Sequence, residues 1–225
     1  MIYCGMATIA SRSDSLWRVL ERLLPQVDVL YLVLNGYEYV PMKLRSLRKV
    51  RPLIGQNHLG DRGKHLFASL HDEGYFVTWD DDLIPEKAAV QRLIDGVNQH
   101  KCICTFHGRR YPNHPIKSYN HGWSLRAQCL KALPHDTWVN VGGTGCMAYD
   151  LKQVRVSVDD FPTASASDLW FSIAAKRQGV KIMALAHEEG VVEHIDHGEE
   201  TIWHDFTKKN DEMLAEWVNR FLLSG

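Results

Sequence analysis

The chain has 225 residues, 45% of them hydrophobic, and its formal net charge at pH 7 is −1. This near-neutral balance gives no global electrostatic reason to bind nucleic acid or a membrane surface, and no segment reaches the roughly 20 apolar residues needed to cross a bilayer. The five cysteines are scattered and odd in number, which favours reduced core thiols of a cytosolic protein over a disulfide framework. We therefore expect a soluble cytoplasmic protein that folds as one domain.

The first 36 residues have the pattern of a β-α-β unit. Residues 2–9 form an expected strand, and a helix follows from residues 13–14 to about Leu24, with apolar side chains along one face. Residues 27–34 are a nearly continuous apolar run, as expected of a strand that is covered on both faces. Such a unit is the building block of a mainly parallel sheet.

The remaining elements follow from local periodicity and from turn residues. We expect strands at 50–54, 75–79, 101–106 and 180–186, helices at 64–71, 85–98, 165–179 and 205–222, and a glycine-rich turn at 139–149 that leads into a strand. Pro85 suits the first turn of its helix. Residues 107–123 show little periodicity and predict a long loop, and long loops in compact domains tend to be functional or mobile.

The apolar strand at 75–79 ends in three consecutive carboxylates, Asp80, Asp81 and Asp82. Adjacent carboxylates at the end of a buried strand are costly unless a positive charge neutralises them. A hard divalent cation such as Mg²⁺ or Mn²⁺ does this well and commonly brings a phosphate group with it. The alternative interpretation is a solvated acidic turn that caps the next helix. Alternation along an extended segment places Asp80 and Asp82 on one side and Asp81 on the other.

Six short segments lie in order along nearly the whole chain: residues 8–12 (TIASR), 34–36 (LNG), 60–64 (GDRGK), 80–82 (DDD), 142–145 (GGTG) and 168–171 (DLWF). Together they resemble the motifs of a family-2-type glycosyltransferase of the GT-A fold. The resemblance implies an α/β fold in which a mixed, mainly parallel, Rossmann-like sheet is flanked by helices. It also implies a single domain over residues 1–225, with a nucleotide-binding half at 1–100 and an acceptor-binding half at 101–225.

For the donor side, the resemblance implies that Asp80 and Asp82 hold Mn²⁺ or Mg²⁺ against the diphosphate of a nucleotide-sugar. A histidine later in the chain commonly completes this metal shell, and His194 is the best placed, with His197 second. The nucleotide site is then expected to comprise Thr8, Ala10, Ser11, Arg12, Asn35, Asp61, Lys64, Asp80 and Asp81. For Arg12 the alternative is a surface charge, and for residues 60–64 it is a polar turn, because the spacing of a P-loop is missing there.

For the acceptor side, the resemblance implies that Asp168 is the catalytic base. Inverting transferases of this fold place an acidic residue after a glycine-containing acceptor loop, where it deprotonates the attacking hydroxyl. The alternative is that Asp168 is only a carboxylate in the first turn of its helix, where the helix dipole favours it. In that case a retaining mechanism is also compatible with the sequence. The acceptor site is expected to include His107, Arg109, Trp123, Gly143 and Thr144.

The implied function is metal-dependent transfer of a sugar from a UDP-sugar to a hydroxyl acceptor, with inversion. The acceptor can be a glycan, a protein or a hydroxymethylated base in viral DNA. The last option is motivated by the basic and aromatic residues of 107–121, and it would place the protein in the cytoplasm of a virus-infected cell. Two alternatives from other classes are a nucleotidyltransferase and a non-catalytic nucleotide-sugar-binding module. The sequence indicates neither the sugar nor the oligomeric state.

Overall fold

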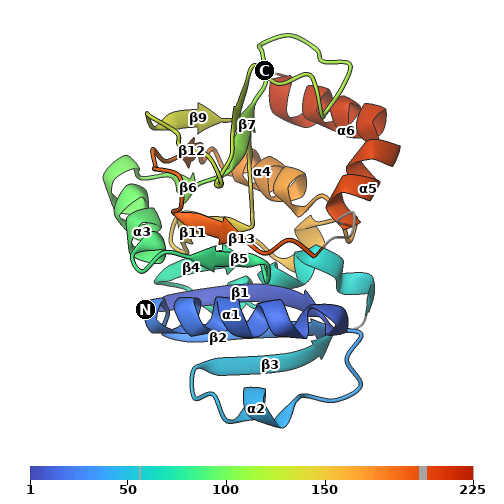
Figure 1. Ribbon diagram of the computed structural model, residues 1–225. Helices are drawn as coiled ribbons and strands as arrows, with labels where there is room; N and C mark the ends of the chain where they lie inside the picture. Colours follow the sequence, from blue (N-terminus) through green and yellow to red (C-terminus); the bar gives the residue numbers. More distant parts are fainter. Residues whose placement is uncertain (56, 198–201, 225) are drawn as a thin grey trace.

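A mixed sheet of eight strands forms the centre of the protein, as seen in a computed structural model that describes residues 1–55, 57–197 and 202–224 (Figure 1). In spatial order the strands are β3 (Val50–Gly55), β2 (Val29–Asn35), β1 (Ile2–Ile9), β4 (Tyr75–Trp79), β11 (Cys146–Asp150), β6 (Ile103–Thr105), β12 (Ile182–Ala184) and β9 (Thr137–Val139). The contacts β3–β2, β2–β1, β1–β4 and β6–β12 are parallel, and the other three are antiparallel. The expected mainly parallel α/β sheet is confirmed.

The predicted β-α-β unit at the N-terminus is confirmed nearly residue by residue. Helix α1 (Ser13–Leu23) connects β1 to β2, and its apolar face at Leu16, Val19, Leu20 and Leu23 is buried. Burial of that face gives the helix its stability, because a helix of this length is marginal alone in water. The connection returns the chain parallel to β1, so both strands end at the same edge of the sheet.

Two hydrophobic clusters cover the two faces of the sheet. Neighbouring residues of β4 divide between them, with Val77 in one cluster and Phe76 in the other, as strand alternation requires. The first cluster packs under α1 and α3 (Ala89–His100), and the second under α4 (Ser167–Arg177) and α6 (Asp211–Trp217). All five cysteines are buried and free of disulfides. No helix in the described ranges is long and apolar enough to cross a membrane.

Two local predictions fail because tertiary contacts override local propensity. Pro85 is not in the first turn of a helix: Leu83–Pro85 form strand β5, which pairs antiparallel with β13 (Val192–His194), and α3 starts only at Ala89. The predicted helix at 64–71 is replaced by two 3₁₀ segments, Asn57–His65 and Ala68–Leu70. Gly60, at φ 53°, interrupts the first of them with a backbone conformation that favours glycine.

The predicted long loop 107–123 is partly built into a second sheet. Strand β7 (Gly108–Arg110) pairs with β10 (Val141–Gly142) on one side and with β8 (Leu125–Ala127) on the other. The rest of the loop is anchored by Tyr111 and Tyr119, which are buried in the second cluster. The closing helix is also divided, into α5 (Ile202–Lys209), α6 and a π-helical turn at Val218–Leu223. A short helix α2 (Met42–Arg45) lies between β2 and β3.

Candidate active site

A cavity of about 700 Å³ opens where β1, β2 and β4 end, at the carboxyl edge of the parallel strands. This edge is the usual ligand-binding position of an open α/β sheet. The cavity, called the central cavity below, brings together most residues that the sequence placed at the site: Thr8, Arg12, Asn35, Asp61, Lys64, Asp80, Asp81, Asp82, His107, Gly143, Thr144, Asp168 and His194. Side chains from both halves of the chain therefore face one space.

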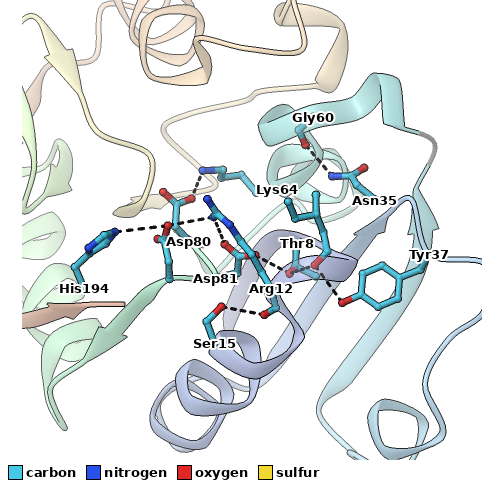
Figure 2. A network of polar contacts seen from close by, with 12 residues as sticks. Thr8, Arg12, Ser15, Asn35, Tyr37, Gly60, Lys64, Asp80, Asp81 and His194 are labelled. Atoms are coloured by element: carbon cyan, nitrogen blue, oxygen red, sulfur yellow. Dashed lines mark hydrogen bonds and ion pairs between the residues drawn. The ribbon is translucent and has the colours of Figure 1, made fainter. Parts of the chain in front are cut away.

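Asp80, the first carboxylate after β4, forms an ion pair with Lys64 (Figure 2). The Lys64 side chain is buried, and burial by itself opposes its charge, but the neighbouring carboxylates Asp80 and Asp61 raise its pKa. The main chain of Asp80 is fixed as well, because its N–H donates to the Gly145 carbonyl at 2.9 Å. Asp80 therefore reaches the central cavity with its charge already partly compensated.

Asp81 is turned toward β1. Its carboxylate accepts a hydrogen bond from the Thr8 hydroxyl at 2.6 Å and another from the Arg12 guanidinium at 2.8 Å (Figure 2). The side chain is buried, so these bonds replace the water that an ionised carboxylate loses on folding. Asp81 thus ties the end of β4 to the end of β1 and shapes the floor of the cavity.

Asp82 lies between a guanidinium and an imidazole. Its Oδ2 is 3.1 Å from Arg12 Nη1 and 3.8 Å from His194 Nε2. Burial, and after it the negative charge of Asp80, raise the pKa of Asp82 to about 6, although Arg12 opposes the shift. Three adjacent carboxylates thus share two cationic partners, Arg12 and Lys64, and the turn retains negative charge.

The side chains at the acidic turn fit the implied metal ion in chemistry but not yet in arrangement. Carboxylate oxygens of Asp80 and Asp82 with the imidazole of His194 are chemically suited to Mn²⁺ or Mg²⁺, and the retained negative charge also favours a cation. Within the described ranges, however, no three acidic, histidine or cysteine side chains are already arranged around a common point. Arg12 already pairs with Asp82 Oδ2, the oxygen that faces His194. A metal ion can bind at that oxygen only if the Arg12 side chain shifts. His197 does not line the cavity.

Asp61 sits in the cavity wall where the 3₁₀ segment meets the loop before α4. Its N–H donates to the Ala164 carbonyl at 3.2 Å, and Asn35 donates to the adjacent Gly60 carbonyl at 3.1 Å. Its Oδ1 is buried without a hydrogen-bond partner among the described residues. Burial raises the pKa of Asp61 to about 6, against the opposing effect of Lys64. A carboxyl group held in this way is available for a ligand donor.

We expect Asp61→Asn to reduce the pH dependence of stability. The folded chain keeps a proton on Asp61 that the unfolded chain releases, so between about pH 4 and 6 stability is lost as the pH rises. Asparagine removes this loss. Urea denaturation at about pH 4.5 and 7.5 should show that the variant loses less unfolding free energy than wild type, by up to about 2 kcal/mol. Asp95→Asn, on the exposed side of α3, is the matched control, and equal losses in wild type and Asp61→Asn would contradict the prediction.

Asp168 lies in the first turn of α4 and is held through one of its two oxygens. Both the N–H and the hydroxyl of Thr144 donate to Asp168 Oδ1 at 2.8 Å. No described residue donates a hydrogen bond to Oδ2. The glycine-rich turn that carries Thr144 therefore fixes the carboxylate while one oxygen stays available in the central cavity.

Four of the expected site residues do not line the central cavity. Ala10 and Ser11 lie in an exposed 3₁₀ turn after β1. Arg109 is buried, with a hydrogen bond to the Tyr119 hydroxyl at 2.9 Å. Trp123 packs against the second hydrophobic cluster and donates to the Asn120 carbonyl at 2.6 Å. The aromatic side chains of 107–123 and Arg109 are thus used inside the fold, whereas Arg110 and Lys117 are exposed.

The polar residues of the cavity wall that were missed by the sequence reasoning include Arg126, Gln128 and Lys131. They follow Trp123 in a segment without a motif or clear periodicity. Pairing of β8 with β7 brings them to the cavity. The only local signal is that polar Arg126 and Gln128 alternate with two buried residues, Ala127 and Cys129, and that signal is not specific.

No protein-family model matches the sequence, and no curated protein matches it. Solved structures do match. The structure of S. aureus TarS 1-349 in complex with UDP-GlcNAc superposes with a TM-score of 0.56 at 12% identity, covering 84% of this chain and 57% of that one. The fold is GT-A-like. The structure of S. aureus TarS gives a TM-score of 0.51 at 12% identity, covering 83% of this chain and 35% of that one.

At this identity the likeness concerns the fold. The chain spans little more than half the length of the first of these proteins and about a third of the second. The match confirms the fold class that was expected from the six short segments.

Proposed function

We propose that the protein transfers a sugar from a nucleoside-diphosphate sugar, with a UDP-sugar as the first candidate, to a hydroxyl group of an acceptor. One observation carries the proposal: the acidic turn after β4 and the oriented carboxylate of Asp168 line a single cavity of a GT-A-like fold. The UDP-GlcNAc bound to the similar structure supports a nucleotide-sugar as the class of donor.

The donor is proposed to lie along the ends of β1, β2 and β4. Arg12 and Lys64 are the cations of this wall and would hold the diphosphate, since a guanidinium and a buried ammonium both suit phosphate oxygens. Asn35 and Asp61 lie farther along the same wall and would contact the base and ribose. When Mn²⁺ or Mg²⁺ is bound by Asp80, Asp82 and His194, it would offset the charge that develops on the departing diphosphate.

Asp168 is proposed to act as the base. Its free Oδ2 would accept the proton of the acceptor hydroxyl as the hydroxyl oxygen bonds to the anomeric carbon of the sugar and the bond to the diphosphate breaks. Attack from the side opposite the diphosphate inverts the anomeric configuration. Thr144 would keep Oδ1 in place throughout, because both its N–H and its hydroxyl donate to that oxygen.

Thr144→Val should lower kcat about tenfold and leave the affinity for the donor unchanged. The substitution removes the hydroxyl bond to Asp168, while the main-chain N–H bond remains, so the carboxylate is less well oriented. Steady-state kinetics of nucleoside diphosphate release measures kcat, and Thr144→Ser, which restores a hydroxyl, should recover most of it. Equal kcat in the Val variant and wild type would show that the hydroxyl does not position the base.

The proposed reaction is tested by incubating the protein with UDP-sugars and Mn²⁺ together with glycan, protein and hydroxymethylated-DNA acceptors. Release of UDP with a glycosylated product is the expected result. Release of pyrophosphate would identify a nucleotidyltransferase instead. A rise in melting temperature with UDP-sugar but no product from any acceptor would favour a binding module. If neither binding nor turnover is seen, the acidic turn serves the fold alone.

A further inference from the structure

One wall of the central cavity carries positive charge that the carboxylates of the site do not balance. Arg126 in β8 and Lys131 beyond it both line the cavity with exposed side chains. Within the described ranges neither forms an ion pair, whereas Arg12 and Lys64 are each engaged with the acidic turn. The two cations therefore remain available to a ligand on the side of the cavity built from the second half of the chain.

The strand register strengthens this observation. Arg126 is directly opposite Arg109 in the antiparallel pair β7–β8, so the two side chains project from the same face of that small sheet. Like charges directly opposite each other are destabilising. Partial burial and then the charge of Arg109 lower the pKa of Arg126. A bound anion would relieve this repulsion, and a guanidinium pairs especially well with the two oxygens of a phosphate.

We propose that Arg126 and Lys131 form a subsite for a phosphate group carried by the hydroxyl acceptor. This inference rests on the proposed glycosyl transfer. The subsite shares a cavity with Thr144 and Asp168, and it comes from the same half of the chain as these two residues. An acceptor whose phosphate is bound here would be positioned for its hydroxyl to approach Asp168, while the donor diphosphate lies at Arg12 and Lys64.

The test measures phosphate binding separately from donor binding. In the first arm, calorimetry gives the dissociation constant of UDP with Mn²⁺ for wild type and for the double variant Arg126→Gln/Lys131→Gln, and we expect less than a twofold difference. In the second arm, inorganic phosphate is titrated into the UDP-saturated proteins, and we expect at least tenfold weaker binding to the double variant. Arg110→Gln is the matched control, because Arg110 is an exposed arginine of β7 that does not line the cavity.

A second measurement needs no ligand. Arg126→Gln alone should raise the melting temperature of the free protein slightly, because it removes the charge that faces Arg109.

The source of the phosphate group is identified by two further ligands. Glucose 6-phosphate and a thymidine oligonucleotide, titrated in place of inorganic phosphate, distinguish a phosphomonoester from a phosphodiester.

Equal phosphate affinity in wild type and the double variant would overturn the subsite. Tenfold weaker UDP binding in the double variant would also overturn it, because the two cations would then belong to the donor site. If UDP does not bind to wild type at all, the proposed glycosyl transfer fails. In that case, phosphate titrated into the free protein still decides whether Arg126 and Lys131 bind an anion.

Discussion

Asp168→Asn should lower kcat about a thousandfold and leave the donor dissociation constant within twofold of wild type. An amide of the same shape cannot accept the proton of the acceptor hydroxyl, and general-base catalysis typically contributes a factor of 10² to 10⁴. The Thr144 N–H and hydroxyl can still donate to the amide oxygen, so the local structure should persist. Steady-state kinetics with a UDP-sugar and Mn²⁺ gives kcat, and calorimetry with UDP gives the dissociation constant.

The contrast between the two measurements makes this prediction specific. A variant that loses both turnover and donor binding would indicate a damaged cavity, and circular dichroism and melting temperature would detect that damage. Asp160→Asn, in a capping box away from the central cavity, is a carboxylate control in the same half of the chain. An Asp168→Asn enzyme with more than a tenth of wild-type kcat would mean that Asp168 is not the base and is only a first-turn carboxylate of α4.

Asp82→Ala should abolish the stabilisation that UDP with Mn²⁺ gives to wild type. Asp82 is the carboxylate that faces His194, and loss of this ligand should weaken the metal-linked affinity at least a hundredfold. The free variant should nevertheless be at least as stable as wild type at pH 7. Burial and Asp80 hold the pKa of Asp82 near 6, so its ionised form is unfavourable in the folded chain.

Thermal denaturation with and without 1 mM UDP and Mn²⁺ measures both effects in one series. The expected pattern is a large ligand-dependent rise in melting temperature for wild type and none for the variant, with the ligand-free values close together. Asp95→Asn should behave as wild type, because Asp95 lies on the exposed side of α3. A variant that UDP and Mn²⁺ stabilise as well as wild type would remove Asp82 from the metal site.

The sequence alone determined the parts of this protein that depend on local pattern. The N-terminal β-α-β unit could be predicted almost to the residue, because the apolar face of α1 and the continuous apolar run of β2 each specify one buried environment. The position of the acidic turn also followed from the sequence, since a strand that ends in three carboxylates must present them at the edge of a sheet. The β-α-β unit indicated a mainly parallel sheet, and the resemblance carried by the six short segments indicated the GT-A fold class.

Tertiary structure decided the elements that depend on distant partners. Residues 83–85 read as the start of a helix, but their pairing with 192–194 keeps them extended and brings His194 to Asp82. Local propensity could not reveal this, because the free energy of a strand pair depends on both strands and their separation in sequence is about a hundred residues.

The basic residues that line the cavity beside the acidic turn were also decided in this way. The sequence pointed to Arg109 and Trp123, yet both side chains are used in packing, and the pairing of β7 with β8 presents Arg126 and Lys131 instead. Which basic side chain reaches a cavity depends on strand register and on what covers each face. Neither strand register nor the covering of a face is encoded in composition or motif spacing. The sequence could therefore locate the acidic turn, Thr144 and Asp168 at the cavity, but not Arg126 and Lys131.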